Sequence, residues 1–147
     1  MESTNQPVAA PMDDVQVSEW VRAQFQKANL FLAEKGIVMD TVAVQDSRYL
    51  PPLVAIWKIN ALDRQSYWVI SGDLPTDHLA IKAAANAREA LRAFSLRWQM
   101  QAQQLIDAGL PDQTSAEYVK LLIDRAHSLY DFFENEQIWA NVSEPTA

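Results

Sequence analysis

The first third of the chain repeats apolar residues every three or four positions. One face of this segment collects Val17, Trp20, Val21, Phe25, Ala28, Phe31 and Leu32. This spacing is typical of an amphipathic helix. Gly36 follows the stripe, where a glycine in the left-handed conformation commonly ends a helix. We therefore predict a helix from about residue 15 to Gly36.

The middle of the chain carries three short runs of β-branched and apolar residues, at residues 37–44, 53–59 and 67–71. We interpret them as strands, and the second run is apolar on both faces. Pro51 and Pro52 place residues 45–52 in a connection, because proline cannot donate to a central ladder. The short polar segment between the second and third runs indicates an antiparallel hairpin.

Helical periodicity returns in the last half of the chain. Residues 79–106 lack Gly and Pro, and Gly109 and Pro111 follow them as expected beyond the end of a helix. Thr114 and Glu117 match a capping box, which predicts a last helix to about Trp139. The expected buried side of that helix carries Tyr118, Leu121, Leu122, Leu129, Phe132 and Phe133.

The element order α-β-β-β-α-α predicts an α+β fold. We expect a small three-stranded antiparallel sheet with an N-terminal helix and a C-terminal antiparallel helix hairpin, the helices packing on one side of the sheet. Residues 1–13 are interpreted as a disordered lead, 14–140 as a single domain and 141–147 as a frayed tail. Trp57 and Trp68, on neighbouring strands, are placed to stack across the sheet.

The strands leave little polar surface for an uncovered sheet face. A second layer is therefore expected, either from the same chain or from a partner subunit. We favour a homodimer, formed through the sheet or through the long helices.

Composition excludes several classes of function. The 147 residues include no cysteine, so thiolate catalysis, disulfides and cysteine-bound zinc are excluded. The three glycines are too scattered for a phosphate-binding loop. A net charge of −7 argues against nucleic-acid binding. The sequence has no secretory signal and no apolar stretch of membrane-spanning length, so we expect a cytoplasmic protein without cofactor or metal.

Two motifs add a resemblance. Residues 67–78 read YWVISGDLPTDH, and residues 86–99 read NAREALRAFSLRWQ. With the Trp20 region and residues 129–131, these segments resemble a small bacterial family of unknown function, over most of the chain outside the two tails. The resemblance implies a compact cytoplasmic bacterial protein and carries over no activity, cofactor or catalytic residue.

The first candidate site is the segment from Ser71 to His78. Asp73, Asp77 and His78 lie within six residues, in a predicted loop between a strand and a helix. A helix N-terminus favours anions, and a histidine can carry a proton near neutral pH. The alternative is structural: Thr76 or Asp77 caps the helix while the glycine and proline shape the turn.

Two further groups of charged residues lie on predicted helices. Arg88 and Arg92 share a helix face, so their like charges repel each other. We expect either a bound anion or an internal ion pair to balance this repulsion. The last helix carries Asp124, His127, Asp131 and Glu134, which we interpret as a solvated face rather than a metal site.

The sequence thus favours a non-catalytic binding or interaction module that self-associates. The alternative is a sensor or enzyme for a small anion or metabolite, using Asp73, Asp77, His78, Arg88 and Arg92. The interaction module implies a protein partner, and the sensor or enzyme implies a small anionic ligand.

Overall fold

The computed structural model describes residues 11–140. The predicted tail, and the predicted lead up to residue 10, lie outside the described residues. The elements in chain order are α1 (Asp14–Glu34), β1 (Met39–Val42), η1 (Val44–Asp46), β2 (Arg48–Leu50), β3 (Val54–Ala61), β4 (Ser66–Gly72), β5 (Asp77–Ala80), η2 (Ile81–Ala83), α2 (Ala87–Ala108), α3 (Gln113–Glu134) and α4 (Glu136–Trp139).

The sheet has five antiparallel strands, so the prediction of three strands was wrong. β3 and β4 form the predicted hairpin. The other edge of β3 pairs with β2 near its start and with β1 near its end. β5 pairs with the outer edge of β4, so that His78 lies opposite Val69. The two missed strands, β2 and β5, have only three and four residues, too few for a periodic pattern.

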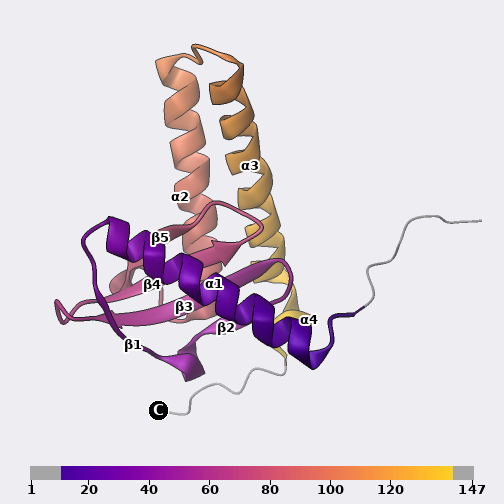
Figure 1. The fold of residues 1–147 in the computed structure, drawn as a ribbon. Helices are drawn as coiled ribbons and strands as arrows, with labels where there is room; N and C mark the ends of the chain where they lie inside the picture. Colours follow the sequence, from indigo (N-terminus) through magenta and orange to yellow (C-terminus); the bar gives the residue numbers. More distant parts are fainter. Residues whose placement is uncertain (1–10, 141–147) are drawn as a thin grey trace, which may run out of the picture.

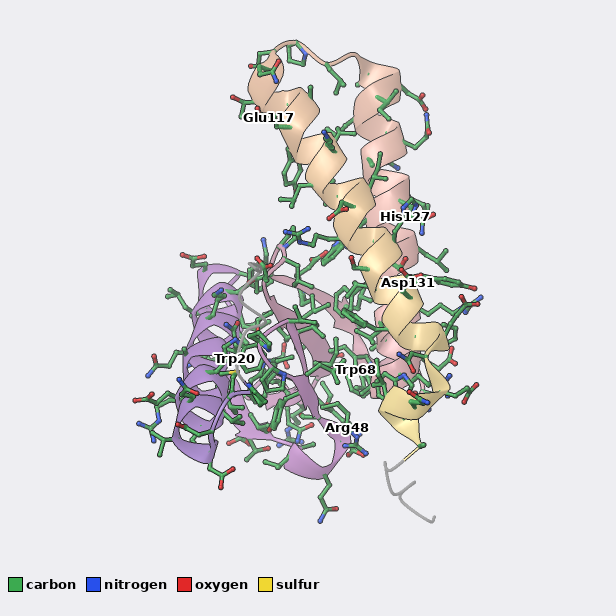
Figure 2. The ribbon with its side chains drawn as sticks, turned by 90° about the vertical axis from the view of Figure 1, so that its right-hand side faces the viewer. Trp20, Arg48, Trp68, Glu117, His127 and Asp131 are labelled. Carbon is green, nitrogen blue, oxygen red and sulfur yellow. The ribbon has the colours of Figure 1, made fainter. Side chains whose placement is uncertain are left out.

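Helices of the same chain cover both faces of the sheet, which corrects the expectation of helices on one side. α1 packs on one face, and α2 and α3 pack on the other (Figures 1 and 2). Side chains alternate between the two faces along β3 and β4. The α1 side receives Ala55, Trp57, Ile59 and Val69, and the α2–α3 side receives Val54, Ile56, Trp68 and Ile70. Trp57 and Trp68 therefore lie on opposite faces and do not stack.

The helices begin and end at local capping interactions. α1 begins with a capping box between Asp13 and Gln16. Asn86 caps α2, which starts at Ala87 rather than at the predicted Leu79. Asp112 caps α3 by accepting from the Ser115 N–H at 2.8 Å, so the predicted capping box of residues 114–117 was wrong.

The ends of the helices agree in part with the prediction. Gly36 and Gly109 follow α1 and α2 with φ of 79° and 89°, as predicted. Asn135 interrupts the predicted last helix, so that residues 136–139 form the separate helix α4.

α2 and α3 form the predicted antiparallel hairpin, and its far half extends beyond the sheet (Figure 1). Leu91, Trp98 and Leu105 lie seven residues apart on α2, and their exposure rises from 0% through 1% to 39%. Tyr118 and Leu121, which we predicted to be buried, are 46% and 36% exposed. The apolar stripes thus continue past the sheet that covers them. Within residues 11–140, no helix is long and apolar enough to span a membrane.

Candidate functional site

Asp77 lies on the edge strand β5, not in a loop before a helix. One carboxylate oxygen accepts hydrogen bonds from Arg97 Nε and Trp98 Nε1 of α2, both at 3.0 Å. The other accepts from the His78 backbone N–H at 2.8 Å. The side chain is 15% exposed, so three donors hold a largely buried carboxylate. Arg97 and Trp98 were not predicted as partners, because the sequence pattern does not reveal the pairing of β5 with β4.

His78 points to the opposite face of the sheet, beneath α1. Its ring packs against Phe31 and Tyr67, with centroid distances of 5.6 and 5.8 Å. Burial lowers the pKa of His78 below its ordinary value, and the neighbouring Asp77 opposes that shift. Its Nδ1 is buried without a hydrogen-bond partner among the described residues. These surroundings keep the imidazole neutral at pH 7.

Asp73 lies at the turn after β4, on the side of α3. Arg125 Nε donates to the Asp73 carbonyl oxygen at 2.8 Å, and the Asp73 carboxylate is 3.8 Å from the same guanidinium and 74% exposed. The preceding Gly72 has a φ of 138°, and a Cβ there would lie 2.3 Å from the Leu53 oxygen. Backbone geometry therefore fixes this turn.

Arg88 and Arg92 have separate surroundings despite sharing a helix. Arg88 Nε donates to the Phe133 carbonyl oxygen at 2.8 Å, and its guanidinium is 3.3 Å from Glu136. That guanidinium also stacks on the Phe133 ring at 5.5 Å. Arg92 is 3.9 Å from Glu89 and half exposed. Ion pairs with Glu136 and Glu89 thus balance the repulsion between the two arginines.

The five candidate residues are not gathered into one concave site. Asp77 contacts α2, His78 contacts α1, and Asp73 contacts α3. Arg88 reaches the end of α3, and Arg92 stays on its own helix. On α3 the four residues Asp124, His127, Asp131 and Glu134 are exposed, and Figure 2 labels His127 and Asp131 on this helix. Residues 11–140 contain no group of three His, Asp or Glu residues positioned to hold a metal ion.

A groove of about 540 Å³ lies between α1 and the β1–β2 edge of the sheet; we call it the α1 groove. Its helix wall consists of Val17, Ser18, Val21, Arg22 and Phe25. Its other wall consists of Val42, Tyr49 and Trp57 of the sheet and Val44 of η1. The apolar residues of the helix were predicted to belong to the core only. Tyr49 fell in the predicted connection, so the pattern did not place it beside Val42, Val44 and Trp57 of the predicted strands.

The hairpin carries the second exposed apolar surface. Within residues 11–140, seven of the 13 exposed large hydrophobic side chains lie between residues 96 and 121. We call these seven the hairpin patch: Leu96, Met100, Leu105, Ile106, Leu110, Tyr118 and Leu121. Leu96 and Met100 also line a groove of about 530 Å³ between α2 and the β5–η2 segment.

Comparison with known protein families identifies a matching family model. A model described as a domain of unknown function, DUF4826, matches residues 14–139, and the chain belongs to this family. The predicted resemblance to a family of unknown function is thereby confirmed at that level, while the motifs and the bacterial origin remain predictions. No curated protein and no solved structure matched the chain.

Proposed function

We propose that this DUF4826 domain is a non-catalytic interaction module that self-associates through the α2–α3 hairpin. One observation carries the proposal: the hairpin patch concentrates exposed apolar side chains along α2 and α3, from the β5–η2 edge of the sheet to the far end of the hairpin. Scattered exposed hydrophobic residues are ordinary, but a concentration of them marks interaction surfaces. A cytoplasmic location belongs to the same proposal and fits the absence of cysteine.

The arrangement of charges favours one mode of pairing. The far end of the hairpin carries Asp107, Asp112 and Glu117. Two hairpins that meet end to end with these residues together bring like charges into contact. An antiparallel arrangement separates the two acidic ends and lets the apolar stripes meet, as helices do in four-helix bundles. The proposed assembly is therefore a two-fold dimer with antiparallel hairpins.

Sedimentation equilibrium tests the proposal directly. Met100 is 63% exposed in the patch, and Leu30 is 62% exposed on α1. Met100→Lys and Leu30→Lys thus change equally exposed side chains, one inside the patch and one outside it. We expect a wild-type dimer, a Met100→Lys monomer and a Leu30→Lys dimer.

Tyr118→Lys extends the same test to α3, and circular dichroism melts verify that each variant folds. A wild-type protein that stays monomeric at the highest soluble concentration would contradict self-association. A dimer that survives both Met100→Lys and Tyr118→Lys would move the interface away from the patch.

The alternative is a small-anion site; because the five candidate residues lie apart, it is reduced to a site at Arg92. Its support is the half-exposed Arg92, whose distance of 3.9 Å from Glu89 leaves the guanidinium accessible. Titration with inorganic phosphate tests it, with Arg92→Gln as the variant. A saturable heat of phosphate binding in the wild type that is absent from Arg92→Gln would favour the alternative. No heat of phosphate binding in the wild type would count against it.

A further inference from the structure

We infer that the α1 groove is a binding site for an amphipathic carboxylate, a molecule with a medium-length apolar tail and an anionic head. The groove lies on the α1 side of the sheet, on the opposite side from the hairpin patch. The inference is thus independent of the proposed self-association. A volume of about 540 Å³ falls in the range of small-molecule sites, about 300–1,000 Å³.

The walls of the groove suit an apolar tail. Phe25 and Tyr49 flank Trp57 at centroid distances of 5.4 and 5.0 Å, which fixes the three rings against one another. Trp57 Nε1 donates to the buried Ser71 Oγ at 3.1 Å. Because that N–H is already satisfied, the indole offers the groove only apolar surface. Val21 and Val42 continue this surface on either side.

The charge at the rim selects the head group. Arg22 is the charged residue of the lining, and it forms no ion pair with a carboxylate of residues 11–140. Arg88, Arg97 and Arg125 all have such partners. A guanidinium with open donors matches a carboxylate in shape and charge. Ser18, one turn before Arg22, adds a hydroxyl to the same wall.

Isothermal titration calorimetry with decanoate, kept below its micelle-forming concentration, tests the inference. Acetate carries the same head without the tail, and decyltrimethylammonium carries the same tail with the opposite charge. We expect saturable binding of decanoate at one site per chain, clearly weaker binding of decyltrimethylammonium, whose head Arg22 repels, and no binding of acetate. Met100→Lys should bind decanoate like the wild type, so the outcome does not depend on self-association.

Three single variants connect the binding to the groove. Arg22→Gln should weaken decanoate binding about fivefold, the upper end for an exposed ion pair. Val44 is a wall residue that is 64% exposed, so Val44→Glu adds a repelling charge without disturbing the core and should abolish measurable binding. Lys27→Gln removes one charge from an exposed position of α1 outside the groove and should leave the affinity unchanged.

The inference is overturned by any of three results. These are no saturable heat with decanoate, equal binding of decyltrimethylammonium, or wild-type affinity in both Arg22→Gln and Val44→Glu. Circular dichroism melts of each variant separate a lost site from a lost fold.

Discussion

Replacement of Asp77 by alanine tests whether its carboxylate is structural or binds a ligand. The side chain links β5 to α2 through Arg97 and Trp98, and the variant removes both bonds at once. Trp98 is 1% exposed, so its N–H has no solvent to replace the lost acceptor. We expect the protein to fold and to lose stability because of that unsatisfied donor.

The size of the effect follows from the two partners. Leaving a buried donor unsatisfied costs about 1–3 kcal/mol. The ion pair adds at most about 1 kcal/mol, because the Arg97 side chain is 43% exposed. The expected total is about 1–4 kcal/mol, or a fall in Tm of about 3–15 °C for a domain of this size.

Urea unfolding of a double-mutant cycle measures the separate contributions. Arg97→Gln removes only the exposed ion pair and should cost about 1 kcal/mol or less. Trp98→Phe removes the buried donor, so adding Asp77→Ala to it should cost clearly less than Asp77→Ala costs alone. The reasoning fails if Asp77→Ala costs no more than Arg97→Gln, or if Asp77→Ala and Trp98→Phe are additive.

Two further predictions concern the neighbouring residues. Gly72→Ala should cost about 3 kcal/mol in chemical denaturation because its Cβ meets the Leu53 oxygen at 2.3 Å. Gly36→Ala also has a positive φ but has nothing within 4 Å of its Cβ, so it should cost less; equal losses would contradict the steric argument. Burial lowers the pKa of folded His78 below its ordinary value of 6.5, so the unfolded chain takes up the proton first as the pH falls. Stability should therefore fall as the pH drops below about 7.5, and the fall should be smaller in His78→Phe; parallel profiles would refute this.

The sequence was informative where one pattern was long enough to dominate. The stripe from Val17 to Leu32 and the hairpin of β3 and β4 were both predicted within a few residues. The start of α2 was misplaced because residues 79–86 contain neither Gly nor Pro, yet Leu79 and Ala80 belong to β5. The side chain of Asn86, which accepts from the Glu89 N–H, decides where the helix begins.

The candidate site was predictable in residue type and not in geometry. Asp77 and His78 are adjacent in sequence. In the predicted loop, adjacent side chains were expected to share one site. In a strand, adjacent side chains point to opposite faces, so the pairing of β5 with β4 directs one to α2 and the other to α1. A strand of four residues carries too little periodicity to reveal that pairing.

Self-association depends on where the exposed apolar residues lie. From the sequence, the apolar surplus lies on the strands, because β3 is apolar on both faces. In the fold, α1 covers the second face, so the strands no longer need a partner subunit. The uncovered residues lie instead on α2 and α3, where Leu105 continues the stripe of Leu91 and Trp98 beyond the sheet. Burial of apolar surface contributes about 25 cal/mol per Å², so a second hairpin laid across these residues is the simplest way to complete the pattern. The proposed interface therefore belongs on the hairpin, and substitutions on the sheet should destabilise the monomer without selectively changing its association.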